Sequence, residues 1–303
     1  MRELRIKLET VTPLLLHGAD NDKNPELRPP PFRGVMRYWW RAALGGIIGD
    51  KNLNALHELE GAVFGNTERA SPIVLRLGEA SIQSAEPKPY LLPHKSVARR
   101  DGVVGIFELI LTQPRHDDAL IWEAACASLE LALTFGGVGQ RSRRGYGALR
   151  IVEATDDKVK PFPTTKHAWK RHVQRVSQQA IDVAMGIANQ TLGADNLGRA
   201  KSLADYPCAT NAGLIQLYDW SESTAMDAVK RFMRQTKKHR AFGGVNPRQA
   251  SPLWMRPIQT GNSYGLLCTV LTSDFRSANY DYLQRFLKNL GGEPLKVKGW
   301  NTL

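Results

Sequence analysis

The order in which strand and helix patterns follow one another constrains the fold of this chain more than any other sequence feature. In residues 1–155, β-type patterns predict four strands and apolar residues at helical spacing predict two helices. The chain order is strand, helix, two strands, helix, strand. Residues 211–303 repeat this order with little sequence identity. A βαββαβ order is that of the ferredoxin-like unit. We therefore predict an α+β protein with tandem ferredoxin-like (RRM-like) domains.

The ends of the strands and helices in the first unit are predicted from changes in the spacing of apolar residues and from residues that can cap a helix. Leu4, Ile6 and Leu8 alternate with charged residues as in a half-buried strand, and a helix follows the prolines at 29–31. Asp117 or Asp118 can cap a second helix that ends at Phe135. The remaining predicted strands are 72–77, 103–112 and 148–154.

The second unit is predicted in the same way. Ser221 or Ser223 caps its first helix. The other expected segments are strands at 214–217, 252–259, 264–272 and 294–297 and a helix at 279–290. Between the units, apolar spacing from Trp169 to Ile187 predicts an additional helix. The predicted domains are 1–155, a helical connector at 156–210, and 211–303. Two unrelated α+β domains with a coincident element order are the alternative.

Composition and cysteine usage narrow the class of protein. With 42% hydrophobic and 23% charged residues the chain is of ordinary globular type. Its three cysteines lack Cys-x-x-Cys spacing, so they predict neither a disulfide framework nor a thiolate zinc site. Residues 1–9 alternate charge with apolar side chains, unlike a secretion signal, and no segment is apolar enough for a membrane helix. We expect a cytoplasmic protein with no membrane partner.

The net charge of +12 favours a polyanionic partner such as nucleic acid. Residues 1–155 hold 20 basic and 18 acidic residues, and the remainder hold 21 and 11. Four windows contain no acid: 27–49, 131–152, 158–181 and 228–273. Such windows suit contacts with a phosphate backbone. For the window 158–181, a solvated helix face whose counter-charges lie on distant segments is as good an interpretation as contact with phosphates. The window 228–273 could bind either RNA or an acidic protein partner.

One face of the first helix carries three arginines. Arg33, Arg37 and Arg41 stand at i, i+4 and i+8, without an interleaved glutamate in the helix. Like charges at this spacing repel one another, so the row favours an anion as its partner. Trp39 and Trp40 are adjacent in the same helix, and we expect both to pack in the core.

A glycine and arginine loop, residues 136–147, precedes the last strand of the first unit. It contains five glycines among twelve residues together with Arg141, Arg143 and Arg144. Glycines allow close approach of the backbone, so amide and guanidinium groups could hold phosphates together. The loop lies between a helix and a strand, the reverse of the context of a dinucleotide-binding loop. Aromatic residues for stacking bases on the sheet are not in the expected positions.

These features together resemble a known family. A βαββαβ domain with a Gly/Arg-rich loop before its last strand resembles the RAMP (repeat-associated mysterious protein) superfamily of CRISPR-associated proteins. Four segments are most similar to the first-named subunit family of the type III-B Cmr RNA-targeting complex. These segments are Pro13–Asp20, Glu26–Ala42, Gly136–Gly147 and Ala250–Pro257.

The resemblance implies a non-catalytic subunit at the head of that complex, beside backbone and small subunits. It would hold the 3′ region of the guide RNA and the target RNA paired to it, in antiviral defence. Contacts should be to phosphate and sugar, since base pairing reads the sequence. No cofactor is implied. The expected RNA-binding residues are His17, Arg33, Gly34, Arg37, Arg41, Gly139, Gln140, Arg141, Ser142, Arg143, Arg144 and Tyr146.

An endoribonuclease is the alternative function. Asp20 and Asp22 follow the first strand, and two carboxylates there could hold a Mg²⁺ ion against a phosphate. A capping role for this pair is the simpler interpretation. His17 could act as a general base, although no partner residue is evident from the sequence.

Overall fold

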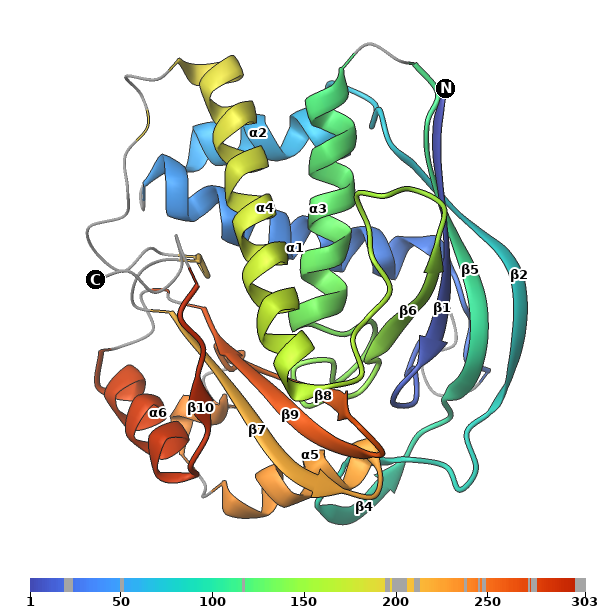
Figure 1. Ribbon diagram of the computed structural model, residues 1–303, viewed down its shortest axis with the longest axis vertical. Helices are drawn as coiled ribbons and strands as arrows, with labels where there is room; N and C mark the ends of the chain where they lie inside the picture. The colour runs from blue at the N-terminus through green and yellow to red at the C-terminus, as the bar shows by residue number, and fades with distance from the viewer. Residues whose placement is uncertain are drawn as a thin grey trace.

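The computed structural model describes residues 1–18, 24–49, 52–115, 118–193, 197, 206–209, 213–236, 239–244, 246, 249–271, 273 and 277–297 (Figure 1). Its helices are α1 (Pro29–Ile48), α2 (Leu53–Phe64), α3 (Ala119–Phe135), α4 (Lys166–Leu192), α5 (Ala225–Gln235) and α6 (Ser277–Asn289), with a short 3₁₀ helix, η2 (Arg240–Phe242). Its strands are β1 (Arg2–Thr10), β2 (Val74–Ser84), β3 (Tyr90–Leu92), β4 (Lys95–Arg99), β5 (Val103–Gln113), β6 (Leu149–Ala154), β7 (Leu214–Glu222), β8 (Leu253–Thr260), β9 (Ser263–Val270) and β10 (Glu293–Pro294).

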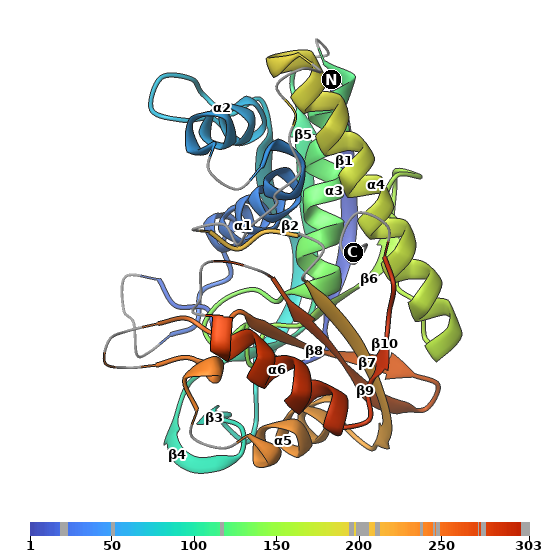
Figure 2. The same ribbon diagram turned by 90° about the vertical axis from the view of Figure 1, so that its left-hand side faces the viewer.

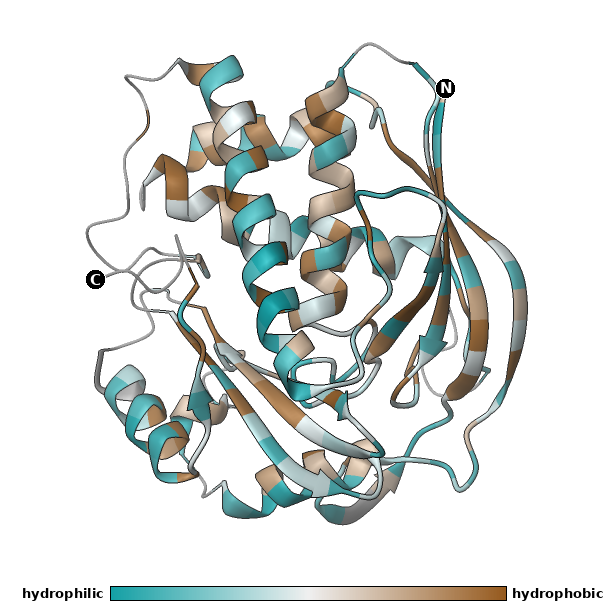
Figure 3. Cartoon of the chain, viewed as in Figure 1, coloured by the Kyte–Doolittle hydropathy of each residue, from teal (hydrophilic) through white to brown (hydrophobic). Residues whose placement is uncertain are grey.

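The first sheet has the strand order β2-β5-β1-β6, and every neighbouring pair is antiparallel. Buried and exposed side chains alternate along β1, as expected for a strand with one covered face, and Leu4, Ile6 and Leu8 are fully buried. These side chains belong to the same core as residues of α1 and α3, which cover one face of the sheet. Figure 3 shows apolar and polar residues alternating along these strands. The opposite face carries the charged residues of β1 and is left open.

The second sheet has the order β10-β7-β9-β8 and is also antiparallel. Neighbouring residues of β7 serve two cores: Leu217 belongs to the core of the first unit, and Tyr218 packs with Val229 and Phe232 of α5. Figure 2 shows α5 and α6 on the side of the sheet away from the first unit. Both faces of the second sheet are therefore covered by protein, in contrast to the first sheet.

The structure confirms the mixed α and β class with antiparallel sheets, and most predicted elements lie within a few residues of their expected positions. Asp118 caps α3 by accepting from the backbone nitrogen of Leu120 at 2.8 Å. The cap of α5 was predicted wrongly: Thr224, not Ser221 or Ser223, accepts from the Asp227 nitrogen. The last strand is confined to Glu293–Pro294. Helix α2 and the β3–β4 hairpin were not predicted.

Helix α4 is the predicted connecting helix, and its apolar face, including Trp169 and Val173, is buried. The basic window 158–181 is largely neutralised in the folded chain. Arg175 pairs with buried Glu130 at 2.6 Å, and the Lys158 ammonium lies 2.7 Å from the Glu123 carboxylate. Lys160, Lys166 and Lys170 also lie in ion pairs. Distant counter-charges therefore account for most of this window.

A buried arginine joins the two units. Arg256 of β8 is 1% exposed, and its guanidinium donates to the carbonyl oxygens of Leu133, at the end of α3, and of Leu149, at the start of β6. Its charge lies 4.9 Å from the ring centre of Phe162 and 5.2 Å from that of Trp169. Backbone acceptors and aromatic faces thus replace a carboxylate as the partners of this buried cation.

Candidate nucleic-acid interface

The glycine loop, residues 136–147, is held by the segment that follows β1. The Gln140 nitrogen donates to the Leu15 carbonyl at 2.9 Å, and the Gly147 nitrogen donates to Pro13 at the same distance. The Thr12 hydroxyl donates to the Gly145 carbonyl at 2.7 Å. Backbone groups from two segments far apart in sequence therefore fix the shape of the loop.

Glycine is required at one turn of this loop for two reasons. Gly147 has φ +64°, a conformation that residues with a side chain rarely adopt. A Cβ atom placed there would lie 1.9 Å from the Val138 carbonyl oxygen. The close approach lets the Val138 nitrogen bond Gly147 at 2.9 Å and close the loop.

The tip of the glycine loop presents two predicted RNA-binding residues to solvent. Gln140 and Arg141 are exposed, and the half-buried Gly139 precedes them with φ +92°. Arg141 itself has φ +58°, an uncommon left-handed conformation for a residue with a side chain. The loop therefore holds this arginine in a backbone conformation that is costly in isolation.

Arg143 of the glycine loop connects the two units. Its guanidinium donates to the Ser251 carbonyl and lies 5.3 Å and 5.0 Å from the ring centres of Tyr38 and Trp254. The backbone is joined as well, because the Met255 nitrogen donates to the Arg143 carbonyl at 3.2 Å. Arg143 was predicted from sequence as an RNA contact, but much of its side chain is used between the units.

Arg144 and Tyr146 are also engaged within the protein. Arg144 donates to the Phe242 carbonyl at 3.4 Å, and burial, followed by the charge of Arg141, lowers its pKa. Tyr146 is 1% exposed, and its hydroxyl donates to the Tyr90 carbonyl of the β3–β4 hairpin. A base therefore has no open face of Tyr146 on which to stack. Ser142 is half-buried between these residues.

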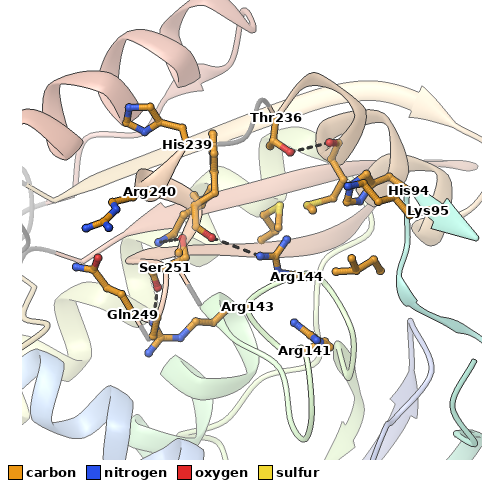
Figure 4. Close-up of a pocket in the computed structure, with 18 of the residues that line it drawn as sticks. His94, Lys95, Arg141, Arg143, Arg144, Thr236, His239, Arg240, Gln249 and Ser251 are labelled. Carbon is orange, nitrogen blue, oxygen red and sulfur yellow. Dashed lines mark hydrogen bonds between the residues drawn. The ribbon is translucent and has the colours of Figure 1, made fainter. Parts of the chain in front are cut away.

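A groove of about 1560 Å³ lies between the glycine loop, the β3–β4 hairpin and the second unit. Figure 4 shows His94 and Lys95 at one side and His239, Arg240 and Gln249 facing the loop. The cations that line it are Lys95, Arg141, Arg143, Arg144, Arg234 and Arg240. No aspartate or glutamate is among the described lining residues. Its apolar lining consists of Leu92, Met233, Phe242, Ala250, Leu253 and Met255.

The arginine row of α1 has an acidic partner that sequence spacing did not predict. The buried Glu60 carboxylate of α2 accepts from Arg41 Nη1 at 2.9 Å and from Arg37 Nε. Arg33 donates to the Ile73 carbonyl at 3.1 Å, and burial, then the charge of Arg37, lowers its pKa. Gly34 is exposed between them, and a Cβ there would contact nothing within 4 Å. Helix α2 therefore supplies Arg37 and Arg41 with a counter-charge that α1 itself does not contain, and binding of an anion by this row stays a prediction.

The open face of the first sheet offers neither aromatic stacking nor unpaired charge along β1. Arg5 bonds Glu3 at 2.9 Å and Glu108 at 3.2 Å, and Lys7 pairs with Glu153. Acid and base therefore alternate across the strands and cancel. The RRM-like mode of binding through the sheet face is not favoured for this unit.

The residues of the alternative enzymatic function are only partly described. Asp20 and Asp22 lie outside the described residues. His17 is 8% exposed, and neither ring nitrogen has a hydrogen-bond partner among the residues that the structure describes. In the same part of the chain, no three His, Cys, Asp or Glu side chains cluster as metal ligands would. No described helix has the length and apolarity to cross a membrane.

The described basic residues of the window 228–273 fall into three groups, and Lys237, Lys238 and Arg248 lie outside the described residues. Lys230 pairs with Asp227 at 3.0 Å and Arg231 with Glu222 at 2.8 Å. Arg256 is the buried link between the units. Arg234 and Arg240 line the groove. The sequence signal for these two residues was the absence of acids, whereas nothing in the sequence had indicated His94 and Lys95 of the hairpin.

The comparisons with known proteins agree with the class that the fold and the glycine loop indicate. Residues 7–150 match the family model of the RAMP superfamily, as the motifs had predicted. The chain is also similar to Cmr1 subunits of Pyrococcus furiosus. It is 25% identical over 308 residues to CRISPR system Cmr subunit Cmr1-1, covering 89% of this chain and 87% of that one. It is 29% identical over 184 residues to Cmr1-2, covering 50% and 96%.

Solved structures show the same fold over nearly the whole chain. The crystal structure of Cmr1 from Pyrococcus furiosus in its apo form has a TM-score of 0.65 at 21% identity, covering 99% of this chain and 100% of that one. A chain in the cryo-EM structure of the type III-B Cmr-beta complex bound to cognate target RNA has a TM-score of 0.60 at 10% identity, covering 95% and 98%. At these identities the likeness establishes the fold alone.

Proposed function

We propose that this chain is a non-catalytic RNA-binding subunit of a type III-B CRISPR (Cmr) effector complex that acts in antiviral defence in the cytoplasm. It holds the 3′ region of the guide RNA and the paired target RNA at the head of the complex, beside backbone and small subunits. The relatives named as Cmr subunits and the fold shared with a chain of a complex bound to target RNA support this proposal.

The proposal includes the tandem ferredoxin-like organisation. In each sheet the fourth strand of the unit pairs with the first, the first with the third, and the third with the second. This order supports two ferredoxin-like units, 1–155 and 211–303, joined by the connector at 156–210. Because the second sheet is buried on both faces, RNA is left with the loops and helix ends of that unit.

The observation that carries the RNA-binding role is the groove at the glycine loop. Six cations line it without an acid among the described lining residues, and the exposed Arg141 is one of these cations. An RNA phosphate backbone is the polyanion that such a groove suits, because each neutralised phosphate releases counterions and strengthens binding. On α1, the partly exposed guanidinium groups of Arg33, Arg37 and Arg41 provide further phosphate donors.

The test compares two variants of the full chain with equal loss of charge. Arg141→Ala/Lys95→Ala removes two cations of the groove, whereas Arg69→Ala/Arg285→Ala removes two exposed arginines elsewhere. Fluorescence anisotropy with a labelled guide–target duplex measures affinity across a salt series. In the groove variant, the fall of the logarithm of the association constant with the logarithm of the salt concentration should be less steep, by roughly 1.4 to 1.8 in the slope. Affinity and slope unchanged in this variant would contradict the proposal.

A further inference from the structure

The wall of the groove opposite the glycine loop is built by the second unit, between the end of α5 and the start of β8. Arg234 lies in the last turn of α5, and Arg240 begins η2. The backbones of Gly244 and Gln249 then bond one another twice, at 2.9 Å each, and close the segment. Arg234 and Arg240 therefore lie on a shaped wall of the groove.

The two arginines of this wall differ from their neighbours in having no carboxylate partner among the described residues. Lys230 and Arg231, one turn earlier in α5, are paired with Asp227 and Glu222. Arg234 is exposed, and Arg240 donates one hydrogen bond, to the Asn246 carbonyl at 3.3 Å. The cations of α5 are thus paired one turn before the groove, whereas Arg234 at the groove lies in no ion pair among the described residues and is attracted by Asp227 only over a longer distance.

His239 gives this wall a fixed hydrogen-bond donor. The Ala241 nitrogen donates to His239 Nδ1 at 3.1 Å, so the neutral ring carries its proton on Nε2. The ring stacks on Tyr282 of α6 with 3.7 Å between ring centres and 8° between planes. These two contacts hold the imidazole in one orientation at the groove (Figure 4).

We infer that Arg234, His239 and Arg240 form a second RNA-binding wall, so that an RNA strand in the groove is held by both units at once. The inference rests on the proposed function and extends it to residues that carry no RNA-binding motif. Cations outside ion pairs that face Arg141 across a groove with no acid among its described lining residues suit the phosphates of a strand that runs between them. The half-buried Leu92 and Phe242 of the apolar lining offer contact to the bases or sugars.

The test uses a matched pair of variants from one short segment. Arg234→Ala/Arg240→Ala removes the two cations that line the groove, and Lys230→Ala/Arg231→Ala removes the same charge one turn earlier in α5, outside the groove lining. The probe is a labelled unpaired RNA of mixed sequence, and the same RNA annealed to its complement is measured in parallel. If log K changes by about 0.7 per contact and decade of salt, two lost contacts weaken binding of the unpaired RNA roughly 25-fold at ~0.1 M salt. The matched control should stay within about twofold of wild type, by the small cost of exposed ion pairs.

The histidine is tested separately with His239→Asn. Asparagine is a good helix N-cap and can keep the bond to Ala241, but it lacks the Nε2 donor. A roughly three- to tenfold loss of RNA affinity is expected from one lost hydrogen bond. An unchanged melting temperature in this variant separates the loss of a contact from unfolding.

The outcomes distinguish this inference from the proposed function. Normal binding by Arg234→Ala/Arg240→Ala, with weak binding by Arg141→Ala/Lys95→Ala, overturns the second wall and leaves the proposed function standing. Normal binding by both variants overturns both. Competition by polyglutamate as strong as that by RNA of equal charge would overturn the inference in favour of an acidic protein partner.

Discussion

Arg41 Nη1 of α1 donates to the Glu60 carboxylate of α2 at 2.9 Å, and Arg37 donates to the same oxygen. The side chain of Glu60 is 6% exposed, whereas those of Arg37 and Arg41 are 32% and 38% exposed. The carboxylate therefore holds both guanidinium groups from beneath while their outer nitrogens face solvent. Helix α2 thus both packs on α1 and orders its arginine row.

The first prediction follows from this arrangement. Glu60→Gln keeps the size of the side chain but removes the charge that both arginines contact, so we expect a loss of about 1–3 kcal/mol in the free energy of unfolding. Urea denaturation measures it. Glu58→Gln, on the exposed side of the same helix, is the control and should change stability by less than about 0.5 kcal/mol. Equal effects of the two variants would refute a special role for Glu60.

A second prediction separates the two roles within the glycine loop. Arg143→Ala removes a hydrogen bond to Ser251 and contacts with two aromatic rings, and should lower stability by about 1–3 kcal/mol. Arg141→Ala should change stability by less than about 0.5 kcal/mol while weakening RNA binding. Thermal melting and anisotropy on both variants test this. A stable Arg143→Ala variant with weakened binding would show that Arg143 acts at the RNA instead.

A third prediction concerns the backbone of the loop. Gly147→Ala places a Cβ 1.9 Å from the Val138 carbonyl oxygen at a positive φ, so it should cost more than about 3 kcal/mol. Gly193→Ala is the matched control, because Gly193 has φ +78° but nothing within 4 Å of the added atom. It should cost only about 1 kcal/mol. Similar unfolding free energies for the two variants would exclude the steric argument.

A fourth prediction is a dependence of stability on pH. Burial, then the charges of Arg175 and Arg256, lowers the pKa of His172 from 6.5 to about 3. Arg175 can only donate to Nδ1, so neutral His172 carries its proton on Nε2 and donates to the Thr134 hydroxyl at 2.9 Å. In the unfolded chain His172 becomes protonated near pH 6.5, whereas in the folded chain it becomes protonated only at about pH 3. Stability is therefore complete above pH 6.5 and falls as the pH drops toward 3.

The measurement is urea denaturation of wild type and His172→Gln between pH 7.5 and 4. The wild type should lose up to about 3 kcal/mol more than the variant over this window. His57→Gln, at an exposed position of α2, should leave the wild-type profile unchanged. A His172→Gln profile as steep as wild type would assign the acid sensitivity to other groups.

The sequence predicted those parts of the fold that local patterns encode. The alternation of Leu4, Ile6 and Leu8 and the cap at Asp118 depend on neighbours a few residues away, so periodicity and capping rules found them. Burial of Trp39 and Trp40 in α1 followed from the same helical spacing and is confirmed. The RAMP resemblance was predicted from motifs that lie within continuous segments.

Pairings between distant segments could not be predicted from one sequence. The contact of Glu60 with Arg37 and Arg41 depends on how α2 packs on α1, and the use of Arg143 depends on where β8 lies. The sequence around an arginine in an acid-free window does not distinguish whether its side chain binds RNA, a carbonyl oxygen or an aromatic ring. Arg256, which is buried between the units, shows how far charge counting alone can mislead.

The burial of the second sheet on both faces has a consequence for how such chains can diverge. A substitution at Leu217 disturbs the core that the second sheet shares with the first unit, and one at the adjacent Tyr218 disturbs the packing on α5 and α6. The open face of β1 places no such limit on Arg5 or Lys7. Among relatives, β7 and β9 should therefore accept few substitutions at any position, whereas the outward-facing residues of β1 should vary. Because residues of the second sheet belong to both cores, a change that separates the two units would expose apolar surface on each of them.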